Sequence, residues 1–487
     1  MFATEREELL ESCFWIPRDR KLGYVDTWSC DGADTSVDST NYRQGYLQDG
    51  EVDDWLHQKG RFVAPTRTHR EAQAARSIRL LMCERVGWKP VAFAMSEPSF
   101  LLIETEFGLP PETLPIICDI KGRESCRLKF DSNNKNLESI AITIKLPQMF
   151  QLGNLGLALT HNLQTGTTSA LIHGENIFSG RIVTNEPSTP HAERLQDMIR
   201  YSASLWTHPL LIPAIILKEH LYRAECLRQK LYPQLTMIER DLGVTRSAGL
   251  VTLEEDFNPE IRHLVRNDDT RLRITTLLNT TAADTVIMVR VLKWDHRYLK
   301  FLRRVSVDIS QFSSTKIPLG VEKEVQGLLN FLEADIVSTG DFGEMMKTRL
   351  DMQLNVLYNF VAQSGNDLNS KIAATAGLDS AAMKTLAFLT AVFLPPTFVA
   401  TLFSMSMFNW QATSDSSMEG DARVVTPSFW IYWVVSIPLT LVTMLVWRVW
   451  WHRQKSFYAG EYLTPKPQHI SVPTNTELYS VRRWGTG

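Results

Sequence analysis

The amino-acid sequence predicts an α+β cytosolic domain, followed by long stalk helices and a C-terminal pair of transmembrane helices. Three observations support this fold class. Short β-like runs separated by Gly, Pro, Asn and Asp fill residues 1–195. Long segments with helical periodicity and few helix-breaking residues follow over 196–380. Two uncharged apolar runs lie within 381–455, and the polar tail, 456–487, is expected to be disordered and cytosolic.

The composition excludes several classes of protein. At about 100–200 residues per domain, a chain of 487 residues has room for more than one domain. The net charge of −3 excludes a generally basic nucleic-acid-binding protein. The six cysteines form no CxxC pair and show no zinc-ligand spacing, which favours a reducing compartment over a disulfide scaffold. The opening MFATEREELLES lacks the basic and apolar regions of a secretory signal, so the bulk of the chain is expected to face the cytosol.

The elements expected in the first part of the chain are short. Runs rich in apolar and β-branched residues predict strands at 99–104, 115–120, 140–146 and 169–172. Helical periodicity predicts a helix at 68–86, and the aspartate-rich segment 30–54 is predicted to be a loop.

The stalk is predicted to consist of long helices, which are expected at 215–242, 269–304 and 321–379. In the last of these, an a/d seam typical of associating helices is formed by Leu350, Leu354, Leu357 and Val361. No strong stop signal follows, so this helix is expected to continue through Lys384 into the first apolar run. The apolar stretch 205–217 is too short to cross a membrane, and we expect it to be a buried segment or a helix entry.

Two segments are predicted to span a membrane, at about 385–408 and 429–447. The apolar part of the first, 386–408, would extend roughly 34 Å as a helix at about 1.5 Å per residue. A bilayer core is about 30 Å thick. Both runs are uncharged and flanked by Trp, Tyr and Phe, which gather at membrane interfaces. The alternative is a pair of buried core helices.

The distribution of charge predicts the orientation of the two spans. Lys371 and Lys384 precede the first span, and basic residues follow the second. The connecting loop, 409–428, carries the acidic residues Asp415, Glu419 and Asp421. By the positive-inside rule, both termini are cytosolic and the acidic loop lies outside. We therefore expect an integral membrane protein, in the plasma membrane or, alternatively, in an organelle membrane.

Hydroxyl side chains line one face of the first span. Thr390, Thr397, Thr401 and Ser404, here named the hydroxyl stripe, fall within roughly 60° of one another at about 100° per residue. They could line a narrow, partly wet path, and neutral hydroxyls suit an ion that keeps its water, as Mg²⁺ does. The alternative is that they bond to their own helix or pack against a neighbouring one.

The run MKTLAFLTAVFLPPTFVATLFSMSMFNW, residues 383–410, resembles the CorA family of divalent-cation channels, and most closely its fungal CorA-like branch, whose relatives include the zinc transporter ZntB. The stalk sequence of residues 353–369 is similar to that branch as well. Pro395 and Thr397 match the Pro-x-Thr of the family. At the position of its hallmark Gly-Met-Asn, this chain has Ser404-Met405-Ser406. The resemblance implies a homopentamer in which the first spans line the pore.

The resulting site assignment combines the stripe with the resemblance. The pore-lining residues are expected to be Thr390, Thr397, Thr401, Ser404, Met405 and Ser406. Hydrophobic gates are expected at Met383, Leu386 and Leu394. The loop residues Asp415, Glu419 and Asp421 would attract cations to the outer mouth. Besides the other copies of this chain in the homopentamer, the expected partners are membrane lipid and divalent cations, with no nucleic acid.

Two functions remain open at this point. In the first, the chain is a homopentameric transporter of Mg²⁺, or of Zn²⁺ or Co²⁺. In the second, it is a non-conducting CorA-derived sensor or scaffold anchored in the membrane, because the hallmark is changed. No nucleotide, hydrolase or metalloprotease motif is present, so no catalytic residue, no cofactor and no resident metal site is assigned, and we do not expect an enzyme.

Overall fold

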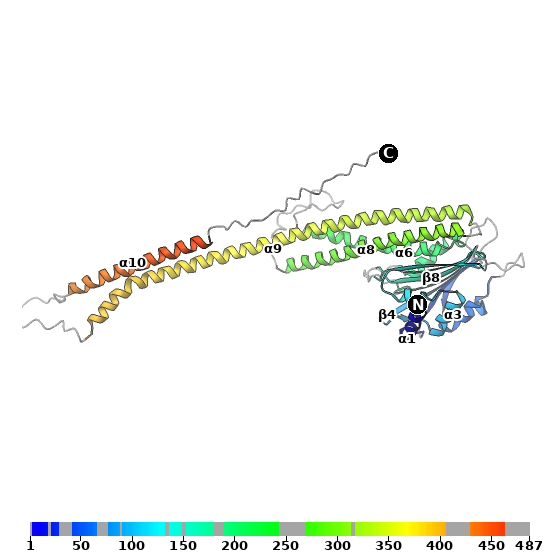
Figure 1. Cartoon of the computed structure of the whole chain (residues 1–487), viewed down its shortest axis with the longest axis horizontal. Helices are drawn as coiled ribbons and strands as arrows, with labels where there is room; N and C mark the ends of the chain where they lie inside the picture. The colour runs from blue at the N-terminus through cyan, green and yellow to red at the C-terminus, as the bar shows by residue number, and fades with distance from the viewer. Residues whose placement is uncertain are drawn as a thin grey trace, which may run out of the picture. The chain divides into compact units, whose positions relative to one another are not determined.

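A computed structural model describes the chain over residues 2–17, 21–28, 41–65, 76–87, 90–131, 136–148, 152–179, 189–242, 268–312, 317–405 and 429–462, with side chains in the last range only to 453. The chain divides into two compact units, 1–361 and 362–487 (Figure 1). The stalk helices share one hydrophobic core with the sheet, which joins them in a single unit.

The first unit is built on a mixed sheet. Its strands are β1 Phe14–Trp15, β2 Leu22–Trp28, β3 Tyr42–Leu47, β4 Arg76–Gly87, β5 Ala92–Phe93, β6 Arg123–Phe130, β7 Leu137–Lys145, β8 Leu155–Asn162 and β9 Thr167–Gly174. Their order is β1-β5-β4-β9-β8-β7-β6, and β2 pairs with both β3 and β4. The β4–β9 pair is parallel, with Leu80 opposite Ala170, whereas the β6–β7–β8–β9 ladder is antiparallel.

Helices cover both faces of this sheet (Figure 1). The described helices of the whole chain, in both units, are α1 Phe2–Ser12, α2 Val52–Leu56, α3 Glu97–Glu106, α4 Thr113–Cys118, α5 His191–Arg200, α6 Leu211–Leu242, α8 Asp268–Phe312, α9 Leu319–Phe403 and α10 Phe429–Tyr462. Short 3₁₀ turns occupy Asp49–Glu51, Gly60–Phe62 and Ala203–Leu205.

Strand periodicity explains the two cores. Alternate residues of a strand point to opposite faces. In β4, Leu80 and Met82 pack in the core with α6, α8 and α9, while Leu81 and Cys83 pack in the core with α1, α3 and α4. In β8, Ala158 points to the second core. This arrangement confirms the predicted α+β fold class with long helices and a C-terminal apolar helix pair.

Two predicted strands are helices. Segments 99–104 and 115–120 lie in or overlap α3 and α4, because a short apolar run does not distinguish a strand from a buried helix. The Ser96 hydroxyl caps α3 by accepting a hydrogen bond from the Ser99 amide at 3.3 Å. All of α4 is buried. The predicted strands at 140–146 and 169–172 are confirmed as β7 and β9.

The helix predicted at 68–86 is wrong over its described part. Residues 76–86 belong to strand β4, a central strand buried on both faces, so its apolar residues do not alternate with polar ones. Residues 68–75 lie outside the described range. The predicted loop 30–54 is wrong in part, because β3 forms within it and α2 begins within it, which buries Tyr42 and Val52.

The long helices are confirmed as α6, α8 and α9, and α9 continues through Lys384 into the apolar run. The stretch 205–217 is buried and enters α6, as expected. The predicted disordered tail, 456–487, is wrong over 456–462, because these residues belong to α10. The first proline after this helix is Pro465, so no proline interrupts it over 456–462. Residues 463–487 lie outside the described range.

A buried histidine makes the first unit sensitive to acid. Burial, and then the charge of His208, lower the pKa of His161 to about 3. Between pH 6.5 and 3 the unfolded chain therefore binds a proton that the folded protein does not. The free energy of unfolding should fall as the pH falls through this window, by up to about 1.4 kcal/mol per pH unit from this residue. Above pH 6.5, His161 is neutral in both the folded and the unfolded chain, so this residue causes no further change in the free energy of unfolding with pH.

Urea titrations between pH 7 and pH 5 test this expectation. His161→Gln should show a shallower decline of stability with acidity than the wild type. The other histidines whose pKa values are lowered by burial, His173, His191 and His208, stay in place and act as the internal reference. Parallel slopes for the two proteins would contradict the prediction.

Candidate functional site

The end of α9 and the whole of α10 contain the apolar segments. Both helices are long and apolar enough to cross a membrane, each with a mean hydropathy of 1.9 over its most apolar window. Only 11% and 6% of these windows are buried. Core helices of a soluble protein are mostly buried, so within the described residues this alternative is not supported.

A pair of prolines shapes α9 within its apolar part. Pro395 and Pro396 lie inside the helix and supply no backbone N–H to the helical ladder. Figure 1 shows the helix axis bending toward its end, as prolines in a helix cause. The Tyr432 hydroxyl of α10 donates a hydrogen bond to the Pro396 carbonyl at 3.2 Å. The two apolar helices are therefore joined at the bend.

One face of α9 is turned toward α10. Pro395 and Val399 are buried on it. The Phe388 ring lies 6.4 Å from the Trp447 ring, and the Lys384 ammonium lies 4.8 Å from the centre of the Trp451 ring. This face of α9 is therefore covered by α10 of the same chain.

The hydroxyl stripe lies on the opposite face. All four of its residues are exposed. At about 100° per residue, their mean direction is roughly 180° from that of Pro395 and Val399. The expected gate residues Met383, Leu386 and Leu394 are 73%, 66% and 64% exposed and lie near the same direction. The structure thus brings the predicted lining and gate residues of α9 together on a face that α10 leaves uncovered.

The three threonine hydroxyls of the stripe use their protons within the helix. Thr390 Oγ1 donates to the Leu386 carbonyl at 2.8 Å, and Thr397 Oγ1 donates to the Phe393 carbonyl at 2.9 Å. Thr401 Oγ1 donates to the Phe398 carbonyl at 2.8 Å. A hydroxyl has one proton and two lone pairs, so each of these groups can offer only acceptor capacity to a further partner. Such a surface suits a cation or the protons of its hydration water.

Part of the predicted site is outside the described residues. Met405 is described and exposed, and the Ser404 amide donates to the Ala400 carbonyl at 3.0 Å at the end of the helix. Ser406, and the loop 409–428 with Asp415, Glu419 and Asp421, lie beyond the described range.

Sequence reasoning missed one charged residue on the stripe face. Asp379 is exposed and precedes Met383 by four residues, about one helical turn. Lys384, by contrast, lies on the face that contacts Trp451 of α10. The two charges at this end of the apolar segment therefore point in different directions. The i, i+4 spacing from Asp379 to Met383 is the signal that could have identified it.

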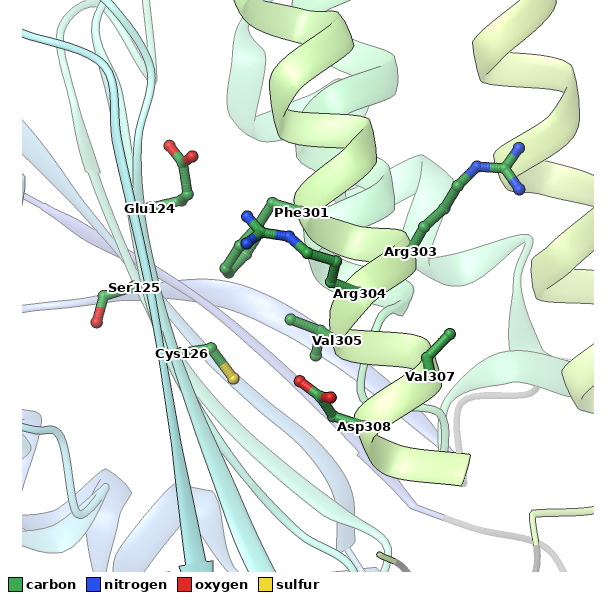
Figure 2. Close-up of a pocket in the computed structure, with 9 residues that line it drawn as sticks. All are labelled: Glu124, Ser125, Cys126, Phe301, Arg303, Arg304, Val305, Val307 and Asp308. Atoms are coloured by element: carbon green, nitrogen blue, oxygen red, sulfur yellow. The ribbon is translucent and has the colours of Figure 1, made fainter. Parts of the chain in front are cut away.

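The first unit contains a cavity beside its sheet. A cavity of about 610 Å³ lies between β6 and α8 (Figure 2), and it is lined by Glu124, Ser125, Cys126, Phe301, Arg303, Arg304, Val305, Val307 and Asp308. Arg303 points away from it and binds Asn330 and Glu333 at 2.8 and 2.6 Å. Burial, and then the charge of Asp308, raise the pKa of Cys126 to about 11, so this thiol is not an activated nucleophile.

The described residues were also compared with the ligand sets that hold metal ions in proteins. Among the described side chains, no group of three or more His, Cys, Asp or Glu could hold a metal ion. The uncovered face of α9 is therefore the best candidate for a functional site.

The chain was compared with known families, sequences and structures. No family profile matches it, and no curated protein matches it significantly. The full-length CmaX protein has a similar structure, with 13% identity, a TM-score of 0.35, and coverage of 88% of this chain and 97% of that one. The cytoplasmic domain of ZntB from Vibrio parahaemolyticus RIMD 2210633 has 9% identity, a TM-score of 0.34, and coverage of 58% and 88%. The fold class is accordingly assigned from the strands and helices themselves.

Proposed function

We propose that this chain spans a membrane and, as a homopentamer, conducts divalent cations, with Mg²⁺ as the first candidate and Zn²⁺ or Co²⁺ as alternatives. The observation that supports it best is the hydroxyl stripe, whose three threonine hydroxyls offer acceptor capacity alone and share an uncovered face of α9 with the gate residues. Two helices of one chain cannot enclose a path, so several copies must surround an axis. The resemblance of residues 383–410 to the CorA family suggests that there are five.

The chemistry of the face favours cations over anions. Mg²⁺ gives up its water reluctantly, and hydroxyl acceptors can bind the protons of that water without replacing it. The carboxyl end of α9, near Phe403, carries the negative end of the helix dipole. With the expected cytosolic termini, this end would lie at the outer mouth.

Divalent-ion uptake by liposomes containing the purified protein tests the proposal. A dye sensitive to Mg²⁺ inside the liposomes reports flux, with Zn²⁺ and Co²⁺ in parallel. Ion-dependent uptake above that of empty liposomes is the expected result. No uptake of any ion by protein that assembles as a pentamer would overturn it.

Thr397→Val should reduce this uptake without loss of assembly. The change keeps the shape of the side chain and removes the acceptor oxygen. One lost hydrogen bond of about 1 kcal/mol corresponds to a roughly fivefold lower rate. Thr440→Val is the matched control, because the Thr440 hydroxyl of α10 donates to the Ser436 carbonyl at 2.7 Å and lies off the stripe. Unchanged uptake in Thr397→Val would mean that the stripe serves packing only.

Asp379→Asn should lower uptake most strongly at low ionic strength. A carboxylate at the cytosolic end of the path raises the local concentration of divalent cations, and salt screens this effect. We expect a loss of roughly threefold to tenfold at low salt and less at physiological salt. Asp351→Asn, at an exposed position far from the apolar segment, provides the control. Equal losses at both salt concentrations would contradict an electrostatic role.

The second candidate function is a membrane-anchored sensor or scaffold that does not conduct. It is favoured by the Ser404-Met405-Ser406 sequence, in which Ser404 carries a Cβ where the family has glycine. The double change Ser404→Gly and Ser406→Asn separates the two functions. Uptake gained by a previously silent protein would support the sensor or scaffold.

A further inference from the structure

Two cysteines that are far apart in sequence meet in the first unit. Cys13 follows the last turn of α1, and Cys118 is the last residue of α4. Their Sγ atoms are 3.9 Å apart, and the two residues are 7% and 8% exposed. A disulfide bond is about 2.05 Å long, so closing the gap requires a movement of roughly 2 Å. Side-chain rotation with a small shift of α1 can supply it.

The surroundings of this thiol pair activate one of its members. The hydrogen bond with Cys118 lowers the pKa of Cys13, and the charge of Arg85 adds to this effect against the opposing influence of burial. Arg85 is held beside the pair, because its Nη1 donates to the Ile117 carbonyl at 3.5 Å. The hydrogen bond with Cys13, and then burial, raise the pKa of Cys118. Cys13 is thus the member that ionises first.

Two other thiols of this unit differ from Cys13 in the direction in which their pKa is shifted. Burial raises the pKa of the buried Cys83 and of the half-buried Cys126. No local sequence motif could have predicted the pair, because 105 positions separate its members. It is the packing of α1 against α4 that creates it.

The movement that closes the pair involves a weakly held element. No residue of helix α1 is fully buried, and its apolar contact with the core comes from the half-buried Leu9 and Leu10. An ion pair from Arg6 to Glu104 of α3 holds it to the unit. Elements with few buried contacts open readily, so a small oxidant can reach Cys13 when α1 loosens.

We propose that Cys13 and Cys118 form a reversible disulfide when the protein meets hydrogen peroxide, and that this bond fastens α1 to α4. The Cys13 thiolate attacks one peroxide oxygen, the O–O bond breaks, and the departing hydroxide takes a proton to become water. The Cys118 sulfur then attacks the sulfenic sulfur of Cys13. The S–S bond forms, the S–O bond breaks, and hydroxide leaves with the Cys118 proton as a second water. Two thiols are oxidised and one peroxide is reduced.

The experiment uses the reduced full-length protein in detergent. It is treated with hydrogen peroxide, alkylated, digested and examined by mass spectrometry. The expected result is a dithiothreitol-sensitive peptide pair linking Cys13 to Cys118, with at least tenfold slower amide hydrogen exchange in α1. Cys226→Ser should behave as the wild type. Cys13→Ser and Cys118→Ala should form no such link, and circular dichroism of each shows whether it is folded.

Other results would overturn the proposal. A wild-type protein whose Cys13 proceeds to sulfinic acid, or whose link joins a different cysteine, does not contain this switch. A link that leaves hydrogen exchange in α1 unchanged would show that the bond does not fasten the helix. These readouts do not depend on ion flux, so they stand apart from the proposed transport function.

Discussion

Replacing Glu219 by leucine is expected to lower the free energy of unfolding of the first unit by about 3–5 kcal/mol. The Glu219 carboxylate is completely buried. It accepts hydrogen bonds from His191 Nδ1 at 2.9 Å, Arg194 Nε at 2.7 Å and Arg223 Nε at 2.8 Å. Burial opposes its ionisation, but the bond from His191 and the charges of its three partners outweigh burial and lower its pKa.

The size of this effect comes from what the substitution leaves behind. Arg223 is 3% exposed, so without Glu219 its charge would remain in the core with no carboxylate partner. Its remaining hydrogen bond, to the Thr189 carbonyl at 3.2 Å, is neutral. A buried charge without a counter-charge costs several kcal/mol.

Urea titration of the full-length protein in detergent, followed by tryptophan fluorescence, measures this loss. Glu225→Leu on the same helix is the matched control. Its carboxylate pairs with Arg228 at the surface, so we expect a loss of about 0–1 kcal/mol. The double change Glu219→Leu with Arg223→Leu should recover part of the lost stability. A loss below about 1 kcal/mol in Glu219→Leu alone would contradict the assigned role of this network.

The Glu219 network illustrates why parts of the fold could not be predicted. Its members come from α5 and α6, and no local pattern pairs His191 with Glu219. The same holds for Cys13 and Cys118, which meet only after α1 and α4 have packed. The long helices and apolar runs could be predicted, because length, periodicity and absence of charge are local properties.

The short apolar segments of the first unit show the opposite case. The same signal, a short run rich in apolar residues, predicted β7 and β9 correctly and 99–104 and 115–120 wrongly. Whether such a run becomes a strand or a helix depends on caps such as Ser96 and on the layer that buries it. Tertiary context decided these elements.

The lining and gate residues of the candidate site stay a prediction, but the structure shows which way they face. The spacing of the hydroxyl stripe is a property of the sequence. The side of the helix that the stripe occupies is known only from the structure. Phe388 and Pro396 contact α10 and Val399 is buried, so the stripe lies on the uncovered face. Asp379 became a candidate for the same reason, because its direction matters only once that face is known.

Replacing Leu386 by serine is expected to raise cation flux about tenfold or more in liposomes. Leu386 is 66% exposed and lies on the stripe face, one turn before Thr390. In the proposed pentamer, five such side chains would form an apolar ring that expels water from the path. Serine brings five hydroxyls to this ring, so water enters and the barrier to a hydrated ion falls. A decrease of about 1.4 kcal/mol in that barrier corresponds to a tenfold faster rate.

Leu441→Ser is a closely matched control for this gate. Leu441 lies on α10 and is 64% exposed, so the same chemical change is made at nearly the same exposure. It is off the proposed path, and its substitution should leave flux within about twofold of the wild type. Equal increases in both variants would indicate a general leak through a disturbed membrane domain. An increase in Leu386→Ser alone would place the barrier on the uncovered face of α9, because the two variants make the same chemical change at nearly equal exposure on different helices.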